Sequence, residues 1–197
     1  MIEHNNRREF FDYHAPHWDD NYPPEIYRRA VEVITSLQIK GREKILDLGC
    51  GNGVLFPILR ELTGGKDRIF GLDFSYAMLK QIPPEFKYNI ASADAAALPF
   101  PPDYFQRVIA FAAFPHFDSR EIVLNEICRV LKYNGFFHVI HLLSSDELRI
   151  HHHHAGGAVK DDILPKAEEF KKILMIVGFR EIEITDKPGL YLMKSTK

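Results

Sequence analysis

The sequence predicts an α/β domain built on a doubly wound, mostly parallel sheet. An apolar run at 44–48 has the length and character of a buried strand, and glycines follow it at alternate positions. A helical pattern then covers 54–62. A second strand-like segment at 68–73 ends in an acid, roughly 20 residues beyond the glycine turn. A strand, a glycine turn and a helix in this order are the ligand-binding unit of doubly wound folds.

The composition is that of an ordinary globular protein. The 197 residues, 46% hydrophobic and 26% charged, suit one domain with its own core. A net charge of −2 gives no reason to expect nucleic acid or a membrane as partner, and no apolar run approaches the roughly 18 residues that cross a bilayer. Cys50 lies in the glycine turn and Cys128 in a helical pattern, so we expect no disulfide. The N-terminus has no apolar leader-like core, so a cytoplasmic location is expected.

The glycine turn differs from the turn that binds dinucleotides. That turn has the spacing G-x-G-x-x-G and holds a pyrophosphate at the helix N-terminus. Here Gly49, Gly51 and Gly53 alternate, Val54 follows them, and Asp47 lies at the end of the strand. A fixed carboxylate repels a pyrophosphate but suits a cationic ligand, and S-adenosylmethionine carries an ammonium and a sulfonium but no phosphate. A tight turn without a ligand and an NAD-dependent oxidoreductase remain alternatives.

Residues 47–53, DLGCGNG, resemble the D-x-G-x-G-x-G signature of class I S-adenosylmethionine-dependent methyltransferases. From about residue 10 to 194 the chain is similar to their small-molecule, type-11-like branch. The resemblance implies a Rossmann-like methyltransferase fold, which is a seven-stranded, mostly parallel sheet with helices on both faces and a reversed C-terminal strand. It also implies S-adenosyl-L-methionine as cofactor and S-adenosyl-L-homocysteine as product. The implied cofactor contacts in the turn are Asp47, Gly49, Cys50, Gly51 and Gly53.

An aromatic segment at 10–20 comes before the first predicted helix. It resembles the F-D-x-x-A-x-x-W-D segment that folds over the cofactor in many small-molecule methyltransferases, which would place Tyr13 and Trp18 over the cleft. A hydrophobic strap packed on the outside of the sheet is the alternative. The first helix is predicted to begin at Pro23 and Pro24, because proline is tolerated in a first helical turn.

The second strand places Asp73 at its carboxyl end. An acid at this position can accept hydrogen bonds from both ribose hydroxyls. Phe74 follows and could lie against the adenine, and Ser75 is a good N-cap for a helix at 76–80. The stretch GLDFSYAML resembles the family's G-x-D-x-S-x-x-M-L, which makes Met78 a cofactor contact, with a plain core role as the alternative.

The next two predicted strands bring further contacts to the same edge of the sheet. The third strand is placed at 86–90, and its exit loop resembles the family's G-D-A-x-x-L-P-F, which assigns Asp94 and Ala95 to the adenine. An Asp in such a loop is otherwise a turn former. The fourth strand, within 103–111, resembles the family's F-D-x-V with Gln in place of Asp. Phe111 ends this strand and is also assigned to the cofactor.

The acceptor side has no matching family motif, and its candidate catalytic groups are histidines. His116 lies in the loop that leaves the fourth strand, at the end of a parallel sheet where ligands bind. An amphipathic helix at 119–131 leads to a fifth strand at 135–143. Within that strand His138 suits a core position, whereas His141 is closer to the crevice.

A run of four histidines, 151–154, lies in a stretch at 144–164 that we predict to be a lid loop over the crevice. Histidines ligate transition metals, so a metal at this run is one hypothesis. Contacts to substrate without a metal and a plain surface run are the others. On a helix His151 and His154 would be neighbours, and these two are the members of the run that we predict to be catalytic. No residue is assigned as a metal ligand.

These segments combine into one predicted methyltransferase domain spanning 1–197. The last helix is expected to begin near 164 and to end before Gly178, and two antiparallel strands follow it. The predicted parts are an N-terminal cap and helix (1–40), a cofactor-binding core (41–143), the histidine-rich lid loop (144–164), and the C-terminal helix and strands (165–197).

The predicted reaction is methyl transfer to a small-molecule acceptor by in-line displacement. Such a reaction depends on alignment and on exclusion of water, and it needs a base only if the nucleophile arrives protonated. A non-catalytic regulatory protein that binds S-adenosylmethionine or a metal on the same fold is the main alternative. We expect a monomer or a homodimer. The candidates for a base are His116, His141, His151 and His154.

Overall fold

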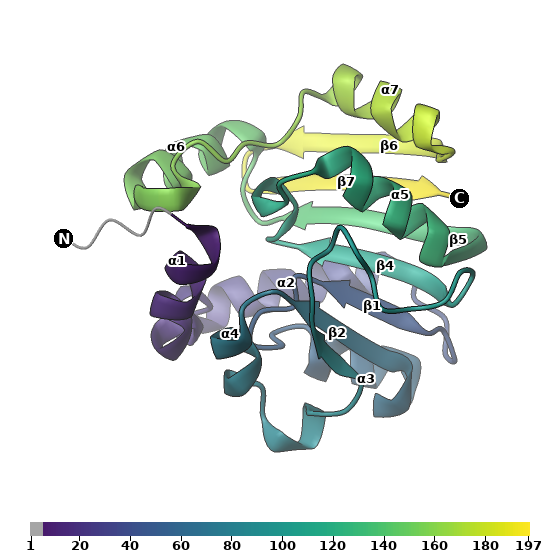
Figure 1. The fold of residues 1–197 in the computed structure, drawn as a ribbon, viewed down its shortest axis with the longest axis horizontal. Helices are drawn as coiled ribbons and strands as arrows, with labels where there is room; N and C mark the ends of the chain where they lie inside the picture. Colours follow the sequence, from purple (N-terminus) through teal and green to yellow (C-terminus); the bar gives the residue numbers. More distant parts are fainter. Residues whose placement is uncertain (1–5) are drawn as a thin grey trace.

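The computed structural model describes residues 6–197 and contains a seven-stranded sheet with the strand order β3-β2-β1-β4-β5-β7-β6 (Figure 1). Neighbouring strands from β3 to β5 are parallel, and β7 runs against both of its neighbours. The predicted fold class, strand number and reversed C-terminal strand are therefore confirmed. The strands are β1 (Ile45–Leu48), β2 (Ile69–Asp73), β3 (Ile90–Ser92), β4 (Phe105–Phe111), β5 (Leu131–His141), β6 (Arg180–Lys187) and β7 (Leu190–Thr196).

Helices cover both faces of the sheet, and each face has its own apolar core. In β4, Val108 and Ala110 belong to the core beneath α5 and α7, while Ile109 and Phe111 belong to the core beneath α2 and α3. This is the period-two alternation of a strand buried on both faces. The helices are α1 (Arg7–His14), α2 (Pro24–Ser36), α3 (Phe56–Thr63), α4 (Tyr76–Gln81), α5 (Arg120–Val130), α6 (Ser145–Ala155) and α7 (Ala167–Val177).

The N-terminal segment begins with a helix that the sequence interpretation missed. α1 and the 3-10 turn η1 (Ala15–Asn21) precede α2, which was expected to be the first helix. Asn6 caps α1 by accepting a hydrogen bond from the backbone N–H of Arg8. Phe11 of α1 packs with Met78 of α4 and Val159, so this segment lies at the end of the sheet where the parallel strands finish.

The third strand is shorter and later than the predicted 86–90. β3 begins at Ile90, and residues Pro84–Phe86 form the 3-10 turn η3 instead. Pro83 precedes this turn and Pro84 begins it, and neither can donate a backbone hydrogen bond to a sheet. Phe86 is apolar because it packs into the core beneath α3, where its ring lies 6.0 Å from the ring of Phe56. Its hydrophobicity thus reports burial in a turn and not membership of a strand.

The stretch 144–164 is not a loop, and this prediction was wrong. It contains α6 and the short 3-10 turn η5 (Gly157–Val159). Ser144 accepts from the backbone N–H of Glu147, and Glu147 accepts from the backbone N–H of Ser144, which completes a capping box. The histidine run therefore occupies the last turns of a helix, and its members point in different directions around the helix axis.

The C-terminal elements agree with the prediction. α7 ends at Gly178, which takes a left-handed conformation with φ of 113°, and β6 and β7 form the expected antiparallel pair.

The predicted fifth strand was placed too late, because β5 already begins at Leu131 and passes Asn134 at a positive φ of 61°. In α5, Val123 is buried, whereas its neighbour Ile122 is 53% exposed.

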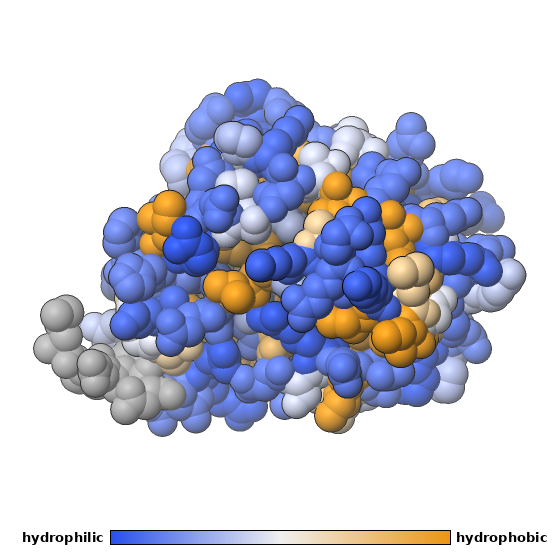
Figure 2. Space-filling view, turned by 90° about the horizontal axis from the view of Figure 1, so that it is seen from above, coloured by the Kyte–Doolittle hydropathy of each residue, from blue (hydrophilic) through white to orange (hydrophobic). Residues whose placement is uncertain are grey.

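The surface seen from above is mainly hydrophilic, with apolar residues in separate groups (Figure 2). Exposed apolar side chains among the described residues include Met175 and Ile176 of α7 and Ile122 of α5. Scattered exposure of this kind is ordinary for a protein surface. Within residues 6–197 no helix is both long enough and apolar enough to pass through a bilayer.

Candidate active site

The glycine turn between β1 and α3 is held in a conformation that side chains rarely adopt. Gly49, Gly51 and Gly53 all have positive φ, from 53° to 82°. A Cβ on Gly49 would lie 2.5 Å from the Cβ of Ala113, so close packing also requires glycine there. A Cβ on Gly51 would meet only the indole nitrogen of Trp18, at 3.7 Å, and would project into a pocket.

Asp73 ties the end of β2 to this turn. Its Oδ2 accepts from the backbone N–H of Gly51 and its Oδ1 from that of Ser75, each at 2.8 Å. The side chain is buried, and burial raises the pKa of Asp73 to about 6, although the backbone N–H groups pull the pKa down. Each oxygen keeps a further lone pair, so the carboxylate can accept from a pair of ligand hydroxyls.

Asp47 is a second buried acid in the same place. It is 1% exposed, and its Oδ2 has no hydrogen-bond partner among the described residues. Burial raises the pKa of Asp47 to about 8, and the nearby charge of Asp73 adds to the effect. A cationic ligand group beside the two acids would stabilise their ionised forms. The turn therefore suits a ligand with positive charge.

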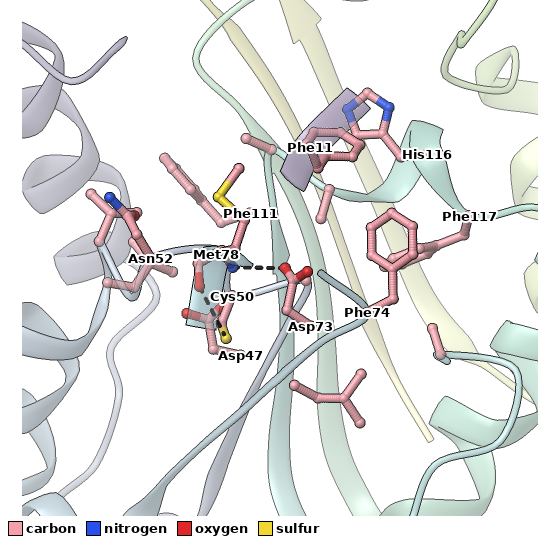
Figure 3. Close-up of a pocket in the computed structure, with 18 of the residues that line it drawn as sticks. Phe11, Asp47, Cys50, Asn52, Asp73, Phe74, Met78, Phe111, His116 and Phe117 are labelled. Atoms are coloured by element: carbon pink, nitrogen blue, oxygen red, sulfur yellow. Dashed lines mark hydrogen bonds between the residues drawn. The ribbon is translucent and has the colours of Figure 1, made fainter. Parts of the chain in front are cut away.

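A pocket of about 900 Å³, partly open to solvent, lies over the turn and the strand ends (Figure 3). Most of the residues predicted to bind the cofactor line it together. They are Trp18, Asp47, Gly49, Cys50, Gly51, Asp73, Phe74, Met78, Asp94, Ala95 and Phe111.

Two residues predicted to bind the cofactor do not line this pocket. Tyr13 is 62% exposed on α1, and a Cβ on Gly53 would face Phe56 and Ile82 inside the fold. The structure brings Phe11 and Tyr22 to the pocket instead. Both lie in or beside the aromatic N-terminal segment, but helical periodicity in α1 decides which aromatic points inward.

The two edges of the pocket differ in character. At one edge Asp94 is exposed, and its Oδ1 accepts from the backbone N–H of Ala96 at 2.8 Å, so it does act as a turn former while lining the pocket. At the other edge aromatic rings follow one another. The ring of Phe11 lies 5.8 Å from that of Phe74 and 5.0 Å from that of His116.

A second pocket, with about 1,370 Å³ of empty space open to solvent, lies beside the first and shares lining residues with it at α1 and His116. His116, Phe11, Trp18 and Phe111 line both pockets. Apolar and aromatic side chains from α1, α2, α6 and the segment that follows β5 make up most of its remaining wall, together with Arg29, His141, His151 and His152. Two neighbouring pockets at the carboxyl ends of parallel strands suit a reaction between two bound molecules.

The histidines of the acceptor side occupy different environments. His152 is 5% exposed and lies on the same face of α6 as buried Leu148, one helical turn before it. His151 is exposed at the rim of the second pocket, and His154 is exposed and lines neither pocket. The sequence interpretation selected His151 and His154, whereas the side chain that points inward is His152.

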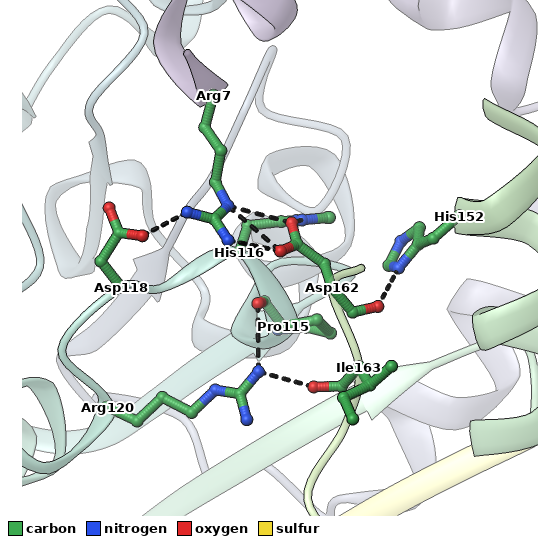
Figure 4. Close-up of polar contacts among 8 residues, drawn as sticks. All are labelled: Arg7, Pro115, His116, Asp118, Arg120, His152, Asp162 and Ile163. Atoms are coloured by element: carbon green, nitrogen blue, oxygen red, sulfur yellow. Dashed lines mark hydrogen bonds and ion pairs between the residues drawn. The ribbon is translucent and has the colours of Figure 1, made fainter. Parts of the chain in front are cut away.

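His116, Asp162 and His141 complete this region. Nδ1 of His116 lies 2.7 Å from Oδ2 of Asp162, and Nδ1 of His152 lies 2.6 Å from the backbone oxygen of Asp162 (Figure 4). His141 is buried, and its Nε2 has no partner among the described residues. His138 points elsewhere and contacts Arg107 at 2.6 Å, in agreement with its predicted core role.

The metal hypothesis finds no support in the described part of the chain. No group of three or more His, Cys, Asp or Glu side chains between residues 6 and 197 is arranged to hold a metal ion. The run itself cannot supply three ligands to one ion, because consecutive residues of a helix point about 100° apart.

Comparisons with known proteins agree with this fold. A family model described as a methyltransferase domain matches residues 46–139. The malonyl-[acyl-carrier protein] O-methyltransferase of Legionella pneumophila is 33% identical over 141 residues, covering 68% of this chain and 49% of the relative. The demethylmenaquinone methyltransferase of Thermus thermophilus is 35% identical over 113 residues, covering 55% and 50%.

The solved structures agree at the level of fold. An S-adenosylmethionine-dependent methyltransferase from Archaeoglobus fulgidus superposes with a TM-score of 0.70 at 19% identity, over 87% of this chain and 93% of that one. The fold and the motif-bearing pocket define a Rossmann-like methyltransferase. The chain belongs to the class I S-adenosylmethionine-dependent methyltransferase family. It spans about half the length of the two curated relatives named above.

Proposed function

We propose that this protein transfers the methyl group of S-adenosyl-L-methionine to a small-molecule acceptor and releases S-adenosyl-L-homocysteine. The observation that carries the proposal is the junction of the two pockets. The first pocket contains the glycine turn and the buried acids, and it shares His116 and residues of α1 with the second, mostly apolar pocket. A methyl donor in the first pocket and an acceptor in the second would meet at this junction.

The residues of the first pocket fit the cofactor part by part. The buried carboxylate of Asp47 suits the cationic end, since its Oδ2 has no partner among the described residues. Asp73 suits the ribose hydroxyls, and Phe74 with Ala95 suits the adenine. When bound, S-adenosylmethionine supplies a methyl group activated on a sulfonium. The protein would align it with the acceptor and exclude water.

The names of the relatives do not identify the acceptor of this protein. Their names refer to molecules as different as demethylmenaquinone and malonyl-[acyl-carrier protein]. The second pocket of this chain favours a small, mainly apolar molecule, because aromatic and aliphatic side chains make up most of its wall.

Calorimetric titration with S-adenosylhomocysteine tests the cofactor half of the proposal, and release of S-adenosylhomocysteine in the presence of apolar acceptors tests the transfer. We expect S-adenosylhomocysteine to bind and NAD to show no comparable binding. Binding of NAD in place of S-adenosylhomocysteine would favour the oxidoreductase alternative. Tight binding of S-adenosylhomocysteine without methylation of any member of a broad acceptor panel would favour the non-catalytic, regulatory alternative.

A further inference from the structure

Asp162 is the meeting point of three segments that are distant in the sequence (Figure 4). Its side chain is 3% exposed. His116, which follows β4, contacts Oδ2 through Nδ1 at 2.7 Å, and Nε of Arg7, on α1, donates to the same oxygen at 3.0 Å. His152, on α6, contacts the backbone oxygen of Asp162 through Nδ1. One acidic residue thus positions two imidazoles at the second pocket.

These partners fix the tautomers of both rings. A backbone carbonyl and an ionised carboxylate can only accept hydrogen bonds, so Nδ1 must carry the proton in each histidine. Burial raises the pKa of Asp162, but the hydrogen bonds from His116 and Arg7 outweigh it and hold the pKa below its ordinary value, so the carboxylate is ionised. In a neutral ring Nε2 is then an unprotonated acceptor.

His116 is the histidine best placed for chemistry. It lines both pockets, so it lies where a methyl donor and an acceptor would meet. Burial lowers the pKa of His116, although Asp162 acts in the opposite direction, and the ring is therefore neutral near pH 7. His141 and His152 line only the second pocket, while His151 and His154 are exposed.

We propose that His116 is the general base of the proposed methyl transfer, that Asp162 and Arg7 position it, and that the acceptor is an uncharged, mainly apolar molecule with an O–H or N–H at the methylated atom. The inference rests on the proposed function. The proton of that O–H or N–H passes to Nε2 of His116. The freed lone pair forms the bond to the methyl carbon. The carbon–sulfur bond breaks, and its electron pair stays on sulfur, which becomes a neutral thioether.

The wall of the second pocket supports this acceptor class. Arg29 is a charged lining residue, but its Nη2 donates to the backbone oxygens of Leu142 and Gly189, so it is already engaged. Burial lowers the pKa of His141 to about 3, with smaller effects from His116 and His152, so this ring stays neutral too. The neutral imidazoles of His116 and His141 and the apolar side chains of the wall do not compensate a charged acceptor, and the guanidinium of Arg29 is directed at two backbone oxygens.

The tautomer of His116 can be tested without knowing the acceptor. Protein labelled with 15N-histidine and saturated with S-adenosylhomocysteine would be examined by multiple-bond 1H–15N NMR at pH 7.5. We expect His116 with its proton on Nδ1. In Asp162→Asn, Arg7 can only donate and therefore takes the amide oxygen, which leaves the amide N–H2 to donate to Nδ1. The proton of His116 should then move to Nε2.

His152 is the internal reference for this experiment, because its partner is the backbone oxygen of residue 162, which the variant keeps. Its tautomer should not change. A wild-type His116 protonated on Nε2 or on both nitrogens would overturn the proposal, as would an unchanged His116 tautomer in a folded Asp162→Asn. If the wild-type protein did not bind S-adenosylhomocysteine, that result would instead overturn the proposed function.

Turnover gives the second test, with a panel of uncharged phenols and azoles as probes. His116→Asn should lower kcat by ~100-fold to ~10,000-fold, the usual contribution of a general base, with the KM for S-adenosylmethionine within about threefold. The residual rate should rise with pH, as hydroxide or ionised acceptor replaces the base. The groups that face His116, namely Asp162, Arg7, His141 and His152, are unchanged in this variant. A variant that retains wild-type kcat would exclude His116 as the base.

Discussion

The two pockets meet at His116, yet the chain builds them in different ways. The acids that we assign to the cofactor, Asp47, Asp73 and Asp94, lie in the first pocket, each within a few residues of the end of β1, β2 or β3. The network beside the second pocket combines Arg7, His116, His152 and Asp162 from separate elements, and Arg7 and Asp162 are 155 positions apart. The first pocket is therefore formed largely by local sequence motifs, whereas the network beside the second pocket forms only through tertiary packing.

The strongest test of the local motif is a side chain at Gly51. Gly51→Val should weaken S-adenosylhomocysteine binding by at least ~100-fold, because a branched residue is strained at φ of 53° and its side chain would occupy the pocket. Gly64→Val is the matched control. It has a similar φ of 70° with nothing within 4 Å of its Cβ, so it carries the strain without the pocket. Calorimetry and circular dichroism would be measured on both, and equal affinities in the two variants would contradict the assignment of the turn.

A smaller effect is expected at the ribose site. Asp73→Ala removes a carboxylate that we assign to the ribose hydroxyls, and charge-assisted hydrogen bonds of this kind contribute about 1.5–3 kcal/mol each. Binding of S-adenosylhomocysteine should weaken roughly tenfold to a hundredfold or more. Asp103→Ala, at an exposed ion pair with Lys197, is the control and should bind like the wild type. Wild-type affinity in Asp73→Ala would remove this residue from the site.

The contrast between the pockets explains what the sequence could predict. The glycine turn, the acids and the parallel strands follow from patterns of a few residues, and the structure brings most of them to one pocket. Both missed helices also carried a local signal. Asn6 precedes Glu9, and Ser144 precedes Glu147, by the three residues typical of a capped N-terminus.

The remainder could not be predicted, because it depends on how elements pack. No pattern in the sequence joins Asp162 to Arg7 and His116. The selection of His152 over its neighbours depends on the rotation of α6, which is fixed by Leu148 entering the core. The predicted third strand failed for a related reason, since Phe86 is buried through a turn.

Variants of the histidine run test, through their stability, which face of α6 points into the fold. His152→Ala should lower the free energy of unfolding by about 1–3 kcal/mol, because it leaves the backbone oxygen of Asp162 without its partner. The double change of His151 and His154 to Ala should alter it by no more than about 0.5 kcal/mol, since both side chains are exposed. Urea denaturation measures both. A double variant less stable than His152→Ala would reverse the assignment of the inward face of α6.

The smallest expected effect is the release of about one proton or less when a cationic ligand binds in the first pocket. Burial raises the pKa of Asp47 from 3.8 to about 8 in the folded protein, with Asp73 adding to the shift. The protonated form is thus favoured by folding, so the stability it contributes is fully present below about pH 4 and is lost as the pH rises through 8. At pH 7 the carboxyl of the free protein is mostly protonated. A cationic ligand beside it favours the ionised form, so binding should expel the proton.

Calorimetry of S-adenosylmethionine binding at pH 7, in buffers that differ in ionisation enthalpy, measures this release directly. We expect the wild-type protein to release up to about one proton and Asp47→Asn to release less, because the amide has no proton to lose near neutral pH. Asp73, whose pKa burial raises to about 6, is already mostly ionised at pH 7 and contributes little. Equal release by the two proteins would mean that the cationic end of the ligand lies away from Asp47, and the match between the buried acid and the ligand charge would then have to be found elsewhere in the pocket.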